Sequence, residues 1–412
     1  MVTTDSGDTA WMLASTAMVM LMTPGLALFY AGMVRAKNVL GTMMHSFVML
    51  GMVGVTWVLW GYGLSFGGDG ALIGNLGWFG LAGVGAIPNA DYAPTIPHSL
   101  FAMYQGMFAI ITPALISGAL AERMRFGAFL WFMALWSTLV YTPIAHWVWG
   151  NGGWLRTLGA LDFAGGTVVH ISSGSAALAG AILLGRRLRL GHEDLAPHNV
   201  TMTVLGAAIL WFGWFGFNAG SALAANGLAS AAFLTTNTAA AAATLSWLLA
   251  ERIHTGKATA LGAASGCVAG LVAITPAAGF VPAWAAVIIG FVVSFLSYGA
   301  IRLKTRLRYD DALDVVAVHL TGGAFGALAT GLFASRAVNQ NGADGLFAGG
   351  GFALLGRQAL AVSATAAFSF LVSWAILRAI SLAVPLRLDR DDETVGLDLS
   401  QHGEVGYNLE AV

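Results

Sequence analysis

The chain has 412 residues, of which 9% are charged and 57% are hydrophobic, and its mean hydropathy is +0.75. A soluble domain carries about 25% charged residues, so this chain has too few polar groups to coat a water-exposed surface. We therefore expect an integral membrane protein. The net charge of −1 argues against nucleic-acid binding, which needs clustered basic residues. A single cysteine, Cys267, leaves no intrachain disulfide.

Eleven apolar stretches, separated by charges and by Gly, Pro and Asn, are long enough to cross a bilayer as helices of about 20 residues. Their length and their Leu, Ala and Gly content predict an all-α integral membrane bundle. The predicted spans lie near residues 10–33, 39–66, 98–121, 126–149, 161–184, 199–219, 231–250, 258–279, 282–302, 313–335 and 352–382.

The basic residues predict the direction of the spans. Of the 19 Lys and Arg residues, only Arg156, Arg336 and Arg357 lie where an even-numbered span meets the next odd-numbered one. Because basic residues stay on the cytoplasmic side during insertion, we predict the N-terminus outside and the C-terminus inside. Residues 1–382 would form the membrane transport domain, and residues 383–412 a cytoplasmic regulatory tail.

A short internal repeat links the two halves. Residues 169–174 (VHISSG) recur as residues 318–323 (VHLTGG) at an offset of 149, and Asp162 and Asp314 precede the two copies. The copies lie in predicted spans 5 and 10, and a shift of five spans reverses direction through the membrane. This pattern predicts inverted repeats of spans 1–5 and 6–10, a peripheral span 11, and a substrate site near the midplane.

Each copy of the repeat carries one histidine, His170 or His319. At ~1.5 Å per residue both lie well inside the bilayer, where ionisable groups are costly and usually functional. The alternative is two neutral histidines bonded to Ser or Thr hydroxyls in helix contacts. Asp162 and Asp314 both suit a helix N-cap, satisfying free backbone N–H groups.

Three long motifs occur in a fixed order along the chain. They are residues 162–170 (DFAGGTVVH), 213–221 (GWFGFNAGS) and 314–319 (DVVAVH). With them the chain resembles the ammonium transporter (Amt/Mep/Rh) family, specifically a bacterial or archaeal Amt. The resemblance runs nearly end to end. It implies a homotrimer in the inner (plasma) membrane, one pore within each subunit, and transport of ammonium and methylammonium.

The resemblance also implies roles for individual residues. Trp149, Ser221, Tyr104 and Asp162 would form the outer recruitment site, Phe108 and Phe217 the gate beneath it, Trp214 the pore wall, and His170 and His319 a twin-histidine pair. On the residues alone, Trp149 equally suits an interfacial aromatic belt, Ser221 a helix end, and the two phenylalanines ordinary packing. Asp162 would order the outer vestibule rather than touch the substrate.

The chemistry of ammonium fits these residues. Ammonium has four N–H donors, a delocalised charge and a removable proton, and an indole ring can hold such a cation by about 0.5–2 kcal/mol. An apolar gate makes the passage of an intact ion costly. We expect recruitment of ammonium outside, deprotonation near the gate, passage of ammonia past the histidines, and reprotonation inside, with the route of the proton left open.

Other classes of function stay as alternatives. An Rh-type ammonia gas channel is the nearest, although Trp149, Ser221 and the second motif favour Amt. An ammonium sensor usually carries a kinase or cyclase domain, for which ~30 tail residues are too few. A haem or metal site at the histidines lacks further intramembrane ligands. We expect no enzyme activity, no cofactor and no metal, and the tail resembles the segment that meets a PII-type signalling protein in bacterial relatives.

Overall fold

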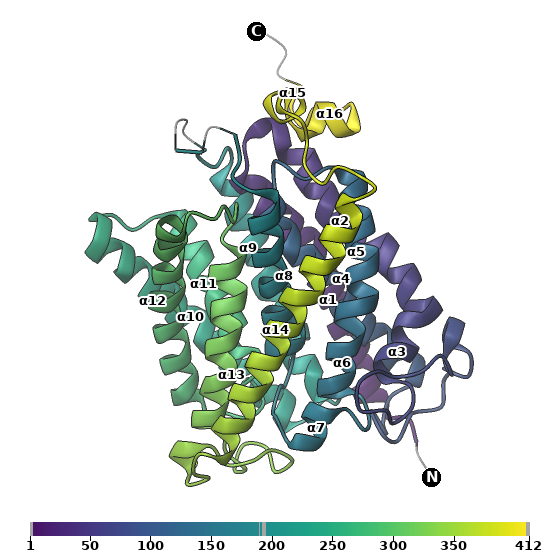
Figure 1. Cartoon of the computed structure of the whole chain (residues 1–412). Coiled ribbons are helices and arrows are strands. Elements are labelled where there is room, and N and C mark those ends of the chain that lie inside the picture. The colour runs from purple at the N-terminus through teal and green to yellow at the C-terminus, as the bar shows by residue number, and fades with distance from the viewer. Residues whose placement is uncertain (1–2, 189, 192–194, 409–412) are drawn as a thin grey trace.

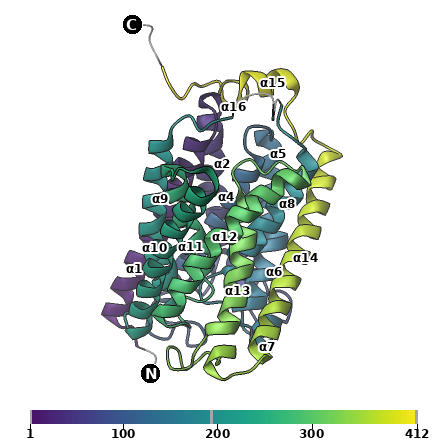
Figure 2. The same ribbon diagram turned by 90° about the vertical axis from the view of Figure 1, so that its left-hand side faces the viewer.

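The computed structural model describes residues 3–188, 190–191 and 195–408, and in these ranges it is a bundle of helices without a β-sheet. Figures 1 and 2 show long helices running side by side. They are α1 Ser6–Met33, α2 Val39–Thr56, α3 Tyr62–Phe66, α4 His98–Leu120, α5 Phe126–Trp136, α6 Thr142–Trp149, α7 Trp154–Leu158, α8 Ser172–Leu184, α9 Val200–Trp214, α10 Gly227–Thr255, α11 Ala260–Ile274, α12 Ala283–Leu307, α13 Thr321–Phe333 and α14 Ala353–Ser381.

The eleven predicted crossings are found in this order. Nine helical segments of the described residues are long and apolar enough to span a membrane, and α10 and α11 complete the eleven. The shortest is α11, with 15 residues, where we had predicted 258–279. It ends at Ile274 because Pro276, which has no backbone N–H, lies in the turns that follow.

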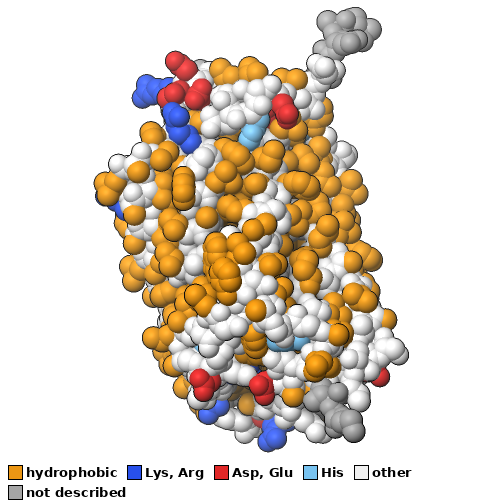
Figure 3. All heavy atoms as spheres, turned by 90° about the vertical axis from the view of Figure 1, so that its right-hand side faces the viewer, with side chains coloured by type: hydrophobic (Ala, Val, Ile, Leu, Met, Phe, Trp, Pro, Cys, Tyr) orange, Lys and Arg blue, Asp and Glu red, His pale blue; other side chains and the backbone are white. Residues whose placement is uncertain are grey.

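The two ends of the bundle differ in what they carry. In Figure 1 the N-terminus and α7 lie at one end, here called the N-face, and the C-terminus lies at the other, the C-face. Hydrophobic side chains cover the middle of the face drawn in Figure 3, and charged side chains gather toward the two ends. An odd number of crossings places the two termini on opposite sides.

The tail closes the C-face with two short helices, α15 Arg390–Val395 and α16 Leu397–His402. The Asp398 carboxylate accepts a hydrogen bond from the Gly41 backbone N–H at 2.8 Å, and the Gln401 side-chain oxygen accepts one from Phe126 N–H at 3.3 Å. The tail is thereby attached to the beginnings of α2 and α5. Residues 409–412 of the predicted tail lie outside the described residues.

A buried ionic network joins the connections at the C-face. Glu122, with 1% of its side chain exposed, lies 3.0 Å from both Arg35 Nε and Arg187 Nη1, and Arg187 Nε lies 3.0 Å from Asp310. Burial by itself raises the pKa of Glu122, but the charges of Arg187 and Arg35 outweigh it and lower the pKa overall. The pKa of Asp310 is lowered in the same way, against burial, by Arg123 and Arg187.

The described residues contain five π-helical turns, two inside a helix and three at an end of one, and in each of them one extra residue widens the helix. They are Trp57–Gly61, Ser137–Tyr141, Gly166–Ile171 (η5), Phe215–Ala219 (η6) and Val316–Leu320 (η8). His170 lies in η5, Phe217 in η6 and His319 in η8. π-helical turns are frequent at functional sites, and three of the predicted pore residues lie in them.

The structure corrects one detail of the repeat. Asp314 was expected to cap the helix of the second copy, but its side chain pairs with Lys304 and its φ is +61°. The Asp311 carboxylate accepts the Val316 N–H instead, at 2.7 Å. Asp311 lies 149 residues after Asp162, the same offset as between His170 and His319. The repeat therefore pairs Asp162 with Asp311, and the chain between each aspartate and its histidine is equally long.

Candidate functional site

A cavity of about 250 Å³ opens at the N-face end of the bundle. Four predicted site residues, Trp149, Ser221, Asp162 and Phe108, line this N-face cavity. The other lining residues are Phe66, Asp91, Tyr92, Phe101, Gln105, Val148, Arg156, Phe163, Leu223 and Phe280. They come from α3, α4, α6, α7, the loops before span 5, the end of span 6 and the turns after α11, so residues distant in sequence line one cavity.

Hydrogen bonds determine which atoms of Trp149 and Ser221 are left to interact with an occupant of the cavity. The Trp149 indole N–H donates to the Asp162 carbonyl at 3.1 Å, which leaves the ring as the surface that Trp149 offers. The Ser221 hydroxyl donates to the Phe217 carbonyl at 2.8 Å, so the lone pairs of its oxygen remain to accept hydrogen bonds. Both side chains present electron density to whatever occupies the cavity.

The Asp162 side chain holds the backbone rather than facing the cavity with a free charge. Its carboxylate accepts the N–H groups of Gly165, Gly166 and Thr167, each at 2.7 Å. These are donors at the first turn of η5 that lack a partner within the helix. The same residue holds Trp149 through its carbonyl, so Asp162 fixes both the beginning of span 5 and the orientation of the indole ring.

Tyr104 lies behind Ser221 and is not among the residues that line the cavity. It is fully buried, and its hydroxyl lies 2.9 Å from the carbonyl oxygens of Gly216 and Phe217 and 3.2 Å from Ser221 Oγ. The hydroxyl proton is shared between these two carbonyls of the widened turn η6, of which Gly216 also accepts the Gly220 N–H and Phe217 also accepts the Ser221 hydroxyl. Tyr104 therefore positions Ser221 and Phe217.

Two phenylalanine rings close the floor of the N-face cavity. Phe108 of α4 and Phe217 of η6 stack with ring centroids 4.1 Å apart and planes 28° apart. The edge of the Trp149 ring meets Phe108 at 5.9 Å. Both phenylalanines are buried, so the stack separates the cavity from the space beneath it.

The two predicted histidines meet below this stack. Their Nδ1 atoms are 3.2 Å apart, and their rings lie 29° from parallel. Trp214 lies 5.6 Å from the His170 ring, and its own N–H donates to the Thr275 hydroxyl at 2.9 Å. The surrounding space, here called the histidine chamber, measures about 10 Å³, roughly enough for one water molecule. Aliphatic and aromatic side chains and the two histidines line it.

His319 also borders a third space on the C-face side. This C-face cavity measures about 70 Å³, and Ser265, Asp314 and Tyr30 are among its lining residues. Four features thus follow one another along the bundle, namely the N-face cavity, the stacked phenylalanines, the histidine chamber and the C-face cavity. In the part of the chain that the structure describes, no three His, Cys, Asp or Glu side chains converge as metal ligands.

Gln105 and Arg156 are two of the lining residues that were not identified from the sequence. Gln105 lines the N-face cavity between Phe101 and Phe108, and the helical spacing of these three residues on α4 is the signal that would have found it. Arg156 also lines the cavity and donates to the Trp149 carbonyl at 2.7 Å. It lies in the short helix α7 between spans 4 and 5, whose position has no periodic signal in the sequence.

Comparisons with known proteins agree with this geometry. The model of the Ammonium Transporter Family matches residues 10–407. An ammonium transporter of Bacillus subtilis is 56% identical over 402 residues, covering 97% of this chain and 98% of that protein.

Two solved structures have the same fold. The crystal structure of Mep2 from Candida albicans superposes with a TM-score of 0.88 at 38% identity, covering 94% of this chain and 87% of that one. A structure described as a sensor Amt protein also superposes with a TM-score of 0.88, at 30% identity, covering 96% of this chain and 98% of that one. With a family model along nearly its whole length and relatives of this similarity, the chain belongs to the ammonium transporter family.

Proposed function

We propose that this ammonium transporter binds ammonium in the N-face cavity, releases one of its protons to water of that cavity near Phe108 and Phe217, and conducts ammonia past His170 and His319 to the C-face, where ammonia takes up a proton again. The observation that carries the proposal is the stack of two phenylalanines directly above a pair of hydrogen-bonded histidines. The N-face cavity supplies the acceptor groups that an N–H-rich cation needs, and the chamber below supplies none of the charge that would hold one.

Size and polarity support the loss of the proton at the stack. A chamber of about 10 Å³ has no room for a hydrated ion, and no carboxylate lines it among the described residues. An unpaired charge at mid-bilayer depth costs at least ~2.5 kcal/mol, whereas neutral ammonia avoids this cost. The apolar floor therefore favours ammonia over both ammonium and potassium.

The histidine pair suits the passage of a neutral molecule. With Nδ1 facing Nδ1 at 3.2 Å, one ring donates its proton and the other accepts it, so a neutral pair has one bare Nε2 and one Nε2–H. His170 Nε2 is buried with no hydrogen-bond partner among the described residues. The pair offers ammonia one acceptor and one donor in succession, without storing charge.

Reconstituted protein tests this function. In proteoliposomes the wild type should take up ammonium and methylammonium and exclude potassium, with the current measured at the same time as uptake. His170→Ala and His319→Ala should each change the ammonium current or admit potassium. His254→Ala, at an exposed site near the end of α10, is the matched control and should behave as the wild type.

Unchanged current and unchanged potassium exclusion in both variants would remove the role assigned to the pair. Uptake by the wild type without any current would favour the ammonia gas channel over the transporter that carries the proton as well. No uptake of ammonium or methylammonium by the wild type would reject the proposed function itself.

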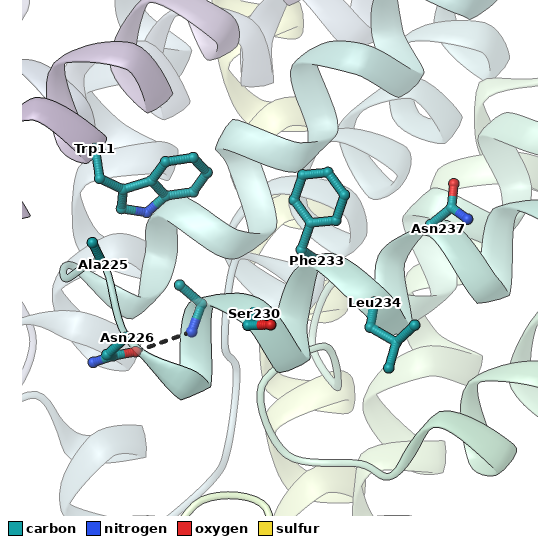
Figure 4. A pocket seen from close by; sticks show the side chains of 8 residues that line it. Trp11, Ala225, Asn226, Ser230, Phe233, Leu234 and Asn237 are labelled. Atoms are coloured by element: carbon teal, nitrogen blue, oxygen red, sulfur yellow. Dashed lines mark hydrogen bonds between the residues drawn. The ribbon is translucent and has the colours of Figure 1, made fainter.

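The same proposal includes a homotrimer as the working form. Figure 4 shows Trp11 of α1 facing Phe233, Leu234 and Asn237 of α10 around a hollow of about 580 Å³. Asn237 is exposed and lies ~15 Å along α10, at the depth of the lipid chains. An amide facing lipid is costly, and a neighbouring subunit would cover it.

Native mass measurement of the solubilised protein tests the assembly. The expected species contains three copies, and Asn237→Arg, which places a charge at the covered surface, should shift it toward monomers. Ser381→Arg at the exposed end of α14 is the control. A wild-type protein that is monomeric under mild detergent conditions would contradict the trimer.

We propose further that the N-face lies outside the cell's inner membrane and the C-face in the cytoplasm. All but three Lys and Arg residues lie toward the C-face in the predicted topology, as insertion requires. To test the orientation, a cysteine introduced by Val405→Cys should be labelled only after the membrane is permeabilised.

We propose that a cytoplasmic tail meets a PII-type signalling protein. A pull-down with and without residues 383–412 tests this partner.

A further inference from the structure

Gln105 is the polar residue on the face of α4 that borders the N-face cavity. Phe101, Gln105 and Phe108 lie at positions i, i+4 and i+7, which share one face of a helix, and all three line the cavity. Gln105 is thus one turn from the gate residue Phe108. Its side-chain oxygen Oε1 is buried and has no hydrogen-bond partner among the described residues.

A buried amide oxygen without a partner is unfavourable until a donor reaches it. In the same cavity, the Ser221 hydroxyl gives its proton to the Phe217 carbonyl, so its oxygen can act as an acceptor. Trp149 keeps its ring free because its N–H goes to the Asp162 carbonyl. Three neighbouring groups therefore present electron density, and the occupant that complements them is a cation with several N–H donors.

We propose that Gln105 Oε1 is a direct ligand of ammonium in the N-face cavity and accepts one of its N–H groups. This inference deepens the proposed function and rests on it. Ammonium has four N–H donors and methylammonium has three, so each additional acceptor in the cavity favours ammonium. Gln105 is then one of the residues that determine the preference between the two cations.

Two substitutions of nearly equal length have opposite expected effects. Gln105→Met removes the acceptor and should raise the KM for ammonium about 10- to 100-fold with Vmax within about twofold, as for the loss of one hydrogen bond to a charged group. Gln105→Glu keeps the oxygen and adds a negative charge, so it should lower the KM at pH 7. In Gln105→Met the ratio of the methylammonium KM to the ammonium KM should also fall. Uptake into proteoliposomes at varied concentrations measures all three quantities.

Met103→Leu, on the exposed face of the same helix, is the control and should leave the KM unchanged. A residue that only packs would give unchanged KM values in both variants, or a loss of folded protein in both, as seen by size-exclusion chromatography. Either result would overturn the inference. So would a shift of the ammonium KM in the same direction in Gln105→Met and in Gln105→Glu. If the wild type transports ammonium normally in that experiment, the proposed function stands although the role of Gln105 does not.

Discussion

At the scale of single residues, side chains that look equivalent in the sequence have different tasks. Trp149 and Ser221 line the N-face cavity, whereas Tyr104 supports Ser221 from behind. Asp162 binds backbone N–H groups at the start of η5 and holds the Trp149 indole through its carbonyl. In the proposed function, recruitment of a cation would depend on acceptors and an aromatic face, with a carboxylate that acts through the backbone.

The hydroxyl of Tyr104 gives a prediction at this scale. Tyr104→Phe removes the donor shared by the Gly216 and Phe217 carbonyls but keeps the ring, and Ser221 remains bonded to the Phe217 carbonyl. We expect a KM for ammonium about two- to fivefold higher and a nearly unchanged Vmax, because a positioning contact is lost but the acceptor stays. Concentration-dependent uptake measures this, and a KM equal to that of the wild type would contradict the positioning role.

At the scale of elements, two repeat-related glycines let the histidine helices cross. A Cβ at Gly174 would lie only 2.4 Å from the Leu320 backbone N, and one at Gly323 would lie 2.9 Å from His170 Cβ. Gly174 and Gly323 are 149 residues apart, the repeat offset. Each glycine thus accommodates the π-helical turn of the opposite repeat, and the close crossing brings the two histidine rings together.

Gly323→Ala should therefore separate the histidines without touching the N-face cavity. The added methyl group forces the His170 backbone outward, and this lowers the folding stability by ~1–3 kcal/mol. We expect a several-fold lower Vmax with the KM for ammonium retained. Gly299→Ala in α12, where a Cβ would meet nothing within 4 Å, is the control. Equal Vmax in both variants would show that the crossing tolerates the methyl group.

The C-face network gives a pH prediction. The pKa values of Glu122 and Asp310 are lowered in the folded protein, so their stabilisation is fully present above the unfolded-state pKa of about 4 and is lost as the pH falls through the lower folded-state values. Thermal unfolding of the solubilised protein should show Tm falling below about pH 4. Glu122→Gln should be less stable at pH 7 and should show a shallower acid-side fall. An identical pH profile for the two proteins would contradict this.

At the scale of the whole molecule, the C-terminal tail meets the start of the second span at the C-face. The Gly41 N–H at the start of α2 and the Asp398 carboxylate in α16 are 357 residues apart and bond at 2.8 Å. The Asn38 side chain accepts the Leu397 N–H at 2.9 Å beside them. The tail is therefore part of the folded bundle rather than an appendage.

Asp398→Ala should loosen this attachment. It leaves a buried backbone N–H unpaired, which costs about 1–3 kcal/mol, and should lower the Tm and speed proteolysis within residues 383–408. Asp391→Ala, at an exposed site in α15, is the matched control. Protease cleavage at equal rates in both variants would show that this bond does not hold the tail.

The sequence alone determined the all-helical membrane fold, the eleven crossings and the repeat of His170 and His319, because apolar length and repeated spacing are local properties of the chain. The resemblance to the ammonium transporter family also indicated Trp149, Ser221 and Phe217 as candidate site residues. Only the tertiary structure showed that Asp311 rather than Asp314 matches Asp162, and that Gln105 has an oxygen without a partner. These depend on which groups of distant segments satisfy one another's hydrogen bonds, and that follows from packing rather than from spacing along the chain.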